Sequence, residues 1–123
     1  MVNPQDPTLR VTMLPRDTNA HGTIFGGVIL SHIDLAGAIA ASRHAAKNFV
    51  TRAIREVGFI APVYVGDVVS FYTSMLREGN TSVTIQVIVE AERNKEPRRQ
   101  VKVTEAEVVY VAVDEDGSPT PIR

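Results

Sequence analysis

The chain has 123 residues, a formal net charge of -1 and 44% hydrophobic residues. This length fits one domain with one hydrophobic core, residues 1–123, and the charge excludes binding of polyanions by bulk attraction. Cysteine is absent, which excludes disulfides, thiol catalysis and cysteine-ligated zinc. We recognise no signal peptide and no membrane-spanning run, so we expect a cytoplasmic protein that binds neither membranes nor nucleic acids.

One long helix is the first strong element along the chain. Residues 7–13 are only a weak strand candidate. Residues 27 to about 46 predict a helix, because they are rich in Ala, Leu and Ile, lack proline and begin after a pair of glycines. Apolar residues lie nearly all round this helix, so we expect the rest of the fold to enclose it. An acid, Asp34, stands in its middle, and we expect that acid to be buried.

The second half of the chain is rich in strand-forming residues. Residues 50–60 are a weak candidate, and residues 68–78, 81–92 and 101–113 are stronger ones. The second of these three alternates apolar with polar side chains, as a half-buried strand does. Polar turns at residues 79–80, 94–99 and 114–117 separate the strands or follow them. The sequence therefore predicts an α+β fold with an antiparallel sheet of about five strands and one long helix.

Five stretches in chain order together resemble a known family. They are PRDTNAHGTIFGG, the helix with Asp34, FIAPVYVGDVV, EGNTSVTIQVIVE and AEVVYVAVDEDG. From about Met13 to Arg123 the chain is similar to the hotdog-fold acyl-CoA thioesterases, in particular the YciA-type bacterial acyl-CoA hydrolases and the brain acyl-CoA hydrolase domains. The resemblance implies a hotdog fold, in which a sheet wraps a long central helix. It also implies hydrolysis of acyl-CoA to a carboxylic acid and CoA, without any cofactor beyond the CoA of the substrate.

The catalytic candidates are Gly26, Gly27, Asp34 and Asn19. Glycines at a helix start let a ligand approach the backbone. Free amides at that helix start can stabilise the oxyanion of thioester hydrolysis. A glycine pair alone, however, more often serves to permit tight packing of the chain. Asp34 can act as a general base on water or as a nucleophile that forms an anhydride, and the residues leave both open. By resemblance, Asn19 positions the water or the thioester; its alternative is a turn-forming role after Asp17.

The spacing of these candidates predicts a site shared by two chains. Gly27 and Asp34 are seven residues apart, about 10 Å along a helix axis at 1.5 Å per residue. One thioester cannot easily touch both, so a site built from two copies is more natural. The resemblance implies the same arrangement, with Asn19 and the helix N-terminus of one subunit beside Asp34 of another. It further implies a homo-oligomer that is a trimer of such dimers.

Basic residues are expected where the phosphates of CoA bind. The candidates are Arg55, Arg77, Arg93, Lys95, Arg98 and Arg99. The resemblance adds substrate-binding candidates near the 79–80 turn, on the 50–60 strand and beside the glycine pair: Thr81, Ser82, Gly58, Phe59, His21 and Phe25. Gly58 stands where related sequences tend to have Asn, so the chain departs from the family pattern where pantetheine contacts are expected.

The remaining polar motifs favour no metal and leave two alternative functions. His21, His32 and His44 lack metal-ligand spacing, so we expect no metal site, and His44 suits the last helical turn, where a cation is favourable. One alternative is a non-catalytic acyl-CoA-binding hotdog module, although the chain has no basic helix of the kind that sensors append. The other is a hotdog enoyl-CoA hydratase, which needs an Asp and a His five residues apart. Asp17 and His21 are four apart.

Overall fold

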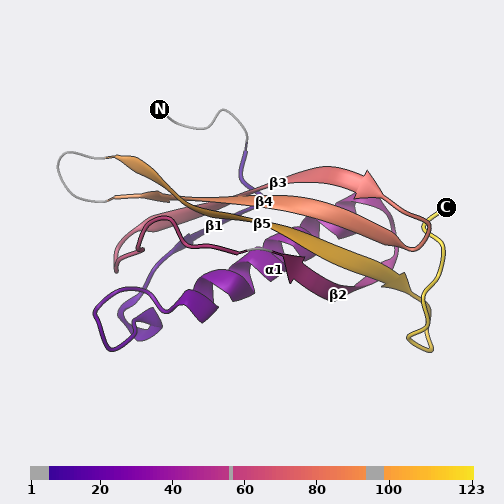
Figure 1. Cartoon of the computed structure of the whole chain (residues 1–123), viewed down its shortest axis with the longest axis horizontal. Helices are drawn as coiled ribbons and strands as arrows, with labels where there is room; N and C mark the ends of the chain where they lie inside the picture. Colours follow the sequence, from indigo (N-terminus) through magenta and orange to yellow (C-terminus); the bar gives the residue numbers. More distant parts are fainter. Residues whose placement is uncertain (1–5, 56, 94–98) are drawn as a thin grey trace.

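One helix crosses one face of a five-stranded antiparallel sheet (Figure 1). The computed structural model describes residues 6–55, 57–93 and 99–123. The elements are β1 (Leu9–Thr12), the short 3-10 helix η1 (Pro15–Asp17), α1 (Gly26–His44), β2 (Asn48–Arg55), β3 (Val68–Glu78), β4 (Ser82–Glu92) and β5 (Gln100–Val113). The strand order is β1-β3-β4-β5-β2, and all neighbours are antiparallel. The predicted α+β arrangement is confirmed.

The meander of β3, β4 and β5 forms the middle of the sheet. The alternating apolar residues of β4 are all buried beneath α1: Val83, Ile85, Val87 and Val89. The turns at residues 79–80 and 114–117 lie where the sequence predicts them, whereas most of the predicted 94–99 turn lies outside the described residues. Strand-forming composition, the alternation in β4 and the turn residues thus suffice to predict these three strands.

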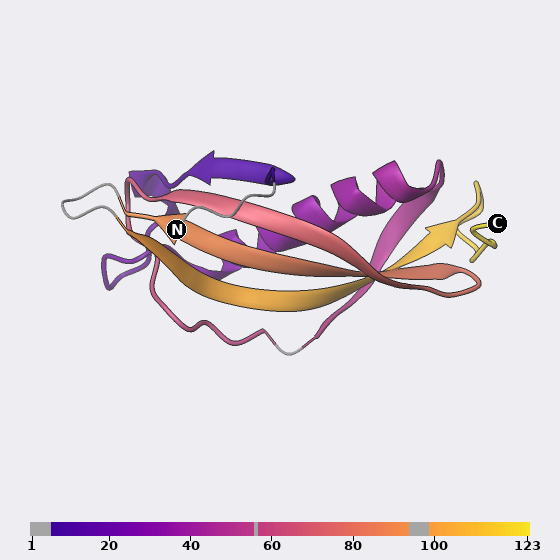
Figure 2. The same cartoon turned by 90° about the horizontal axis from the view of Figure 1, so that it is seen from above.

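The two edge strands are shorter than the sequence predicts. β1 spans four residues instead of seven, and β2 ends at Arg55 instead of residue 60. After β2 the chain leaves the sheet as an irregular connection that runs beside β5 (Figure 2). Pro62 lies in this connection and has no N–H to donate to a strand ladder. The predicted 50–60 strand is therefore correct only in its first part, and residues 57–60 lie outside any strand.

The sheet covers only one side of α1 (Figure 2), so the expectation of an enclosed helix is wrong for the single chain. The buried residues of α1 are Ile29, Ile33, Ala36, Gly37 and Ala41. On the side away from the sheet Leu35 is 50% exposed, and Asp34 is half-buried rather than buried as expected. The physical reason is that one sheet offers one face, and the described residues include no second layer. An exposed apolar surface of this kind is typical of protein–protein contact.

A network of charges closes the end of α1 against β3. His44, the last residue of the helix, lies with Nε2 2.5 Å from Oε1 of Glu78, and Arg123 donates to the same carboxylate at 2.9 and 3.2 Å. Hydrogen bonds from Arg123 and His44 lower the pKa of Glu78 to about 2. His44 thus occupies the predicted last turn and also makes a specific contact. Within the described residues no helix is both long and apolar enough to cross a membrane.

Candidate active site

Asp34 is held by hydroxyl groups from two strands. Its Oδ1 accepts a hydrogen bond of 2.6 Å from the Thr51 hydroxyl and a longer one of 3.2 Å from the Tyr110 hydroxyl. The Tyr110 hydroxyl also donates to the backbone carbonyl of Asp34 at 2.6 Å. Across the described part of the chain, no group donates to the other carboxylate oxygen, Oδ2. One oxygen is therefore fixed in place, and the second is available to a ligand.

The two hydroxyls meet because Thr51 and Tyr110 are direct partners in the register of β2 and β5. Side chains of cross-strand partners lie on one face, about 5 Å apart, so both reach the same carboxylate. Tyr110 is fully buried; burial raises its pKa well above the usual range, and the neighbouring Asp34 acts in the same direction. Neither residue is among those predicted from the sequence. Tyr110 stands at an inward-facing position of β5, where a hydroxyl needs a partner.

The first turn of α1 combines free amides with aromatic packing. No side chain caps the helix at Phe25, and the amides of Gly26 and Gly27 donate no hydrogen bond within residues 6–55, 57–93 and 99–123. A Cβ on Gly27 would lie 2.7 Å from the Phe25 ring, and one on Gly26 would lie 3.5 Å from the Phe59 ring. A side chain at position 27 would thus displace the exposed Phe25 ring, and the Gly27 amide stays open. Both sequence interpretations of the glycine pair therefore fit this geometry.

Asn19 organises the loop that precedes α1. Its Oδ1 accepts hydrogen bonds from the amides of His21 (2.8 Å) and Thr23 (3.3 Å), and its Nδ2 donates to the Thr23 hydroxyl at 2.9 Å. The turn-forming role is thus present in the single chain, and His21 lies exposed at the loop tip. Asp17 accepts a hydrogen bond from the amide of Leu14 at 3.0 Å. No hydrogen bond joins Asp17 to His21 in the described residues.

The sequence matches known enzymes over nearly its whole length. Residues 21–98 match the family model of the Thioesterase superfamily. The chain is 44% identical over 116 residues to the acyl-CoA thioester hydrolase YciA of Salmonella typhimurium, covering 93% of this chain and 87% of that protein. The chain belongs to the acyl-CoA thioesterases of the YciA type. The predicted family, and with it the predicted class of enzyme, is confirmed.

Two solved thioesterase structures share the fold of this chain. One is a hexameric hotdog fold thioesterase of Campylobacter jejuni, with a TM-score of 0.91 and 43% identity over 97% of this chain and 91% of that one. The other is a hexameric broad-specificity acyl-coenzyme A thioesterase, solved as a mutant in which one aspartate is replaced by alanine. It has a TM-score of 0.91 and 40% identity over 96% of this chain and 86% of that one. The predicted hotdog fold is confirmed.

A basic pocket of the thioesterase lies on the face of the sheet turned away from α1. Its volume is about 280 Å³, and it is lined by Arg52, Ala53, Arg55, Arg77, Ser82, Thr84 and Val109. Three guanidinium groups and two hydroxyls border it, with no carboxylate among the lining residues. The structure thus brings together Arg55, Arg77 and Ser82 from the sequence candidates and adds Arg52, which the sequence analysis missed.

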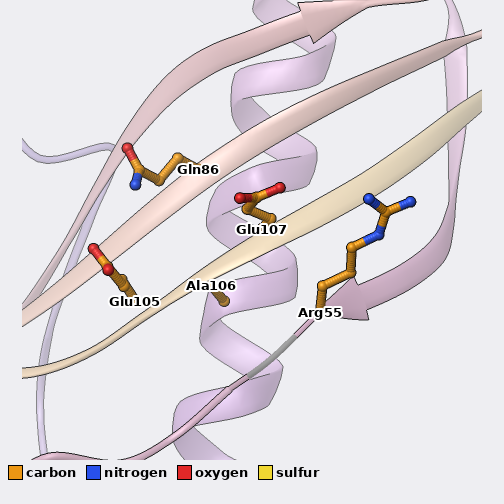
Figure 3. Close-up of a pocket in the computed structure, with 5 residues that line it drawn as sticks. All are labelled: Arg55, Gln86, Glu105, Ala106 and Glu107. Carbon is orange, nitrogen blue, oxygen red and sulfur yellow. The ribbon is translucent and has the colours of Figure 1, made fainter.

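A neighbouring pocket of about 320 Å³ shares Arg55 but differs in charge (Figure 3). Gln86 and two carboxylates, Glu105 and Glu107, border it on the same face of the sheet. Two acids beside one guanidinium disfavour a polyanion. Of the two pockets, the basic pocket is the one suited to phosphate groups.

Arg93 is already engaged by its own chain. Its guanidinium forms an ion pair with the buried Asp67, donates to the carbonyl of Pro62 at 2.8 Å and lies 4.8 Å from the centre of the Tyr64 ring. These contacts fasten the connection that follows β2 to the end of β4. These contacts give Arg93 a structural role, and they leave few N–H groups of its guanidinium free to bind a phosphate.

The other candidates for substrate binding are dispersed. Thr81 is half-buried, and its backbone carbonyl accepts a hydrogen bond from the amide of Ala112 at 2.8 Å. The backbone carbonyl of Gly58 accepts one from the Thr104 hydroxyl at 2.6 Å. Arg99 is exposed, whereas Lys95 and Arg98 lie outside the described residues. In the described residues, no three side chains of His, Asp or Glu are grouped so as to hold a metal ion.

Proposed function

We propose that this thioesterase hydrolyses acyl-CoA with Asp34 as the group that activates or delivers the attacking oxygen. The observation that carries the proposal is the unequal state of the two Asp34 oxygens. Thr51 and Tyr110 hold Oδ1, while Oδ2 accepts no hydrogen bond from any described residue. The Asp34 carboxylate is also only half-buried, so a ligand can reach it. A relative solved with an aspartate replaced by alanine lends further support.

In the proposed reaction a water oxygen adds to the thioester carbonyl carbon while one water proton passes to Asp34. The carbonyl oxygen becomes an oxyanion, which the free amides of Gly26 and Gly27 stabilise. The intermediate then collapses with cleavage of the carbon–sulfur bond. The proton leaves Asp34 for the sulfur, so the products are a carboxylic acid and CoA.

Asp34 can instead attack the carbonyl carbon itself, which gives an anhydride and releases the CoA thiolate. Single-turnover hydrolysis in water enriched in oxygen-18 tests for this second route. Label on the Asp34 side chain after one turnover identifies a nucleophile, because water has then opened the anhydride at the aspartyl carbonyl. Label in the released acid with none on Asp34 fits a general base, and it also fits an anhydride that water opens at its acyl carbonyl.

The active site is proposed to form between two copies of the chain. Three features support this: the exposed Leu35 side of α1, the unpaired outer edge of β2 in the described residues, and the separation of about 10 Å between Gly27 and Asp34 along the helix. The hexameric state of two relatives agrees with such pairing. In this arrangement the first turn of α1 and the Asn19 loop of one chain lie beside Asp34 of its partner. We propose a trimer of such dimers as the whole assembly.

Subunit exchange tests the shared site. Asn19→Ala and Asp34→Ala, each expected to be poorly active, are unfolded and refolded together. A mixed dimer has one site with both changes and one site with neither. Random pairing makes half of the dimers mixed, so activity is expected to recover to roughly a quarter of the wild-type value.

The controls for this exchange are each variant refolded alone, which should recover nothing, and the wild-type chain refolded alone. Mass measurements verify that subunits have exchanged. A mixture that stays inactive although its subunits have exchanged would mean that Asn19 and Asp34 act within one chain, or that one of them is not needed.

The phosphates of CoA are proposed to bind in the basic pocket. Arg52, Arg55 and Arg77 supply three guanidinium groups there, and Ser82 adds a hydroxyl. Guanidinium groups suit phosphate oxygens because they donate in a planar fork. Arg93 is not included, since its contacts with Asp67 and Pro62 occupy it.

A comparison of two substrates tests this pocket. Replacing Arg52 or Arg77 with Gln should raise KM for acyl-CoA about threefold, as an exposed ion pair contributes up to about 1 kcal/mol. KM for an acyl-pantetheine thioester, which lacks the nucleotide, should stay unchanged. Arg43→Gln is the matched control, because Arg43 is exposed at the end of α1 and does not line the pocket. Equal KM changes for both substrates would contradict the proposal that the phosphates bind in this pocket.

A further inference from the structure

Tyr110 contacts Asp34 in two ways at once. Its hydroxyl donates to the helix carbonyl of Asp34 at 2.6 Å and lies 3.2 Å from the carboxylate oxygen Oδ1. The ring is fully buried, so it cannot contact a substrate, and any effect on the reaction must pass through Asp34. Burial also raises the pKa of Tyr110 far above its usual range, so the hydroxyl keeps its proton at neutral pH.

The helix is shaped to receive this hydroxyl. A Cβ on Gly37 would lie 2.2 Å from the Tyr110 oxygen and 2.9 Å from two of its ring carbons. A side chain at that position would therefore push the ring away from the helix. Gly37 follows Asp34 by three residues and lies on the same side of α1, facing the sheet.

We propose that Tyr110, seated against Gly37, is a positioning residue that holds the Asp34 carboxylate with Oδ2 turned toward the substrate. Thr51 alone fixes Oδ1 at one point, so the carboxylate remains free to rotate about that contact. The second hydroxyl adds a second point, on a ring that cannot move because its surroundings are packed. This inference rests on the proposed role of Asp34.

Tyr110→Phe tests the proposal because it removes the hydroxyl and keeps the ring. We expect kcat to fall about tenfold, equal to about 1.4 kcal/mol of lost transition-state stabilisation, while KM changes by less than about twofold. The matched control is Val87→Ala, a buried position on β4 that faces α1 and whose side chain has no polar atom to contact Asp34. It should lower the melting temperature and leave kcat unchanged.

Gly37→Ala is the second variant, because it displaces an intact hydroxyl. It should lower kcat to a similar extent, and the double variant with Tyr110→Phe should be no slower than the slower single variant. Wild-type kcat in folded Tyr110→Phe would overturn the proposal. The proposal would also be overturned if Val87→Ala, at the same loss of stability, lowered kcat as much as Tyr110→Phe does.

Asp34→Asn, assayed alongside, separates this inference from the proposed function. If Asp34→Asn is inactive and Tyr110→Phe is fully active, only the positioning role fails. If Asp34→Asn is fully active, the proposed role of Asp34 fails instead.

Discussion

Replacing Gly37 with alanine has two opposite effects on the stability of the fold: it improves helix propensity and worsens packing against Tyr110. In the middle of a helix alanine is more favourable than glycine by about 1 kcal/mol. At this position the new Cβ would lie 2.2 Å from the Tyr110 oxygen and 2.9 Å from two ring carbons. Ordinary contacts begin near 3.4 Å, so the fully buried ring must move by about 1 Å, since cores pack without room to spare.

The magnitude follows from the two penalties. Overpacking of a core costs about 1–3 kcal/mol. A displaced Tyr110 hydroxyl that loses its acceptors on Asp34 leaves a buried polar group unpaired, which costs about 1–3 kcal/mol more. After subtraction of the alanine gain of about 1 kcal/mol, Gly37→Ala should lower the free energy of unfolding by about 1–5 kcal/mol.

Urea unfolding at one fixed protein concentration measures this change, because the stability of an oligomer depends on concentration. The control places Gly37→Ala in a Tyr110→Leu background, where the ring is absent. There the same substitution should stabilise the protein by about 1 kcal/mol, so the sign of the effect reverses. If Gly37→Ala stabilises the chain that retains Tyr110, the ring moves freely and the reasoning is refuted.

Three further predictions concern single groups. Asp34→Asn should keep the fold and lower kcat about a hundredfold or more; thiol release and a melting curve on one preparation check this, and unaltered turnover would contradict it. Glu78 has its pKa lowered to about 2 by Arg123 and His44, so its carboxylate stabilises the fold above about pH 4.5, and this contribution is lost as the pH falls toward 2. The difference in melting temperature between wild type and Glu78→Gln should therefore shrink from pH 6 to pH 2. A difference that stays constant would mean that the ionised Glu78 carboxylate, with its contacts to Arg123 and His44, is not the cause of the difference. Tyr110 has a raised pKa, so its contribution is present below its ordinary value of 10 and lost as the pH rises beyond it. Wild type should then lose stability above pH 10 more steeply than Tyr110→Phe, and parallel losses would contradict the burial of the hydroxyl.

The strands of the meander could be predicted from local pattern, whereas the edge strands could not. β3 coincides with the predicted 68–78 strand, and β4 begins one residue later than predicted. Alternation predicts β4 and strand-forming composition predicts β3, because each has neighbours on both sides and one face against α1. β2 has a neighbour on one side only, and its end depends on where the chain leaves the sheet, which no local pattern encodes.

The candidate site shows the same division. Gly26, Gly27 and Asp34 could be selected because each is unusual for its place in a helix. Thr51 and Tyr110 could not, because their contact with Asp34 depends on the register of β2 against β5 and on the position of α1 above them.

The sequence by itself determined the α+β architecture, the long helix with its acid and, through five motifs, the acyl-CoA thioesterase family. Periodicity and composition act over a few residues, so they suffice for elements and for motifs. Only the tertiary structure decided that α1 is covered on one side, that Asp34 is half-buried, and that its Oδ1 is held by Thr51 and Tyr110. Each of these facts depends on the packing of residues distant in the chain, since exposure and hydrogen-bond partners are properties of the assembled fold.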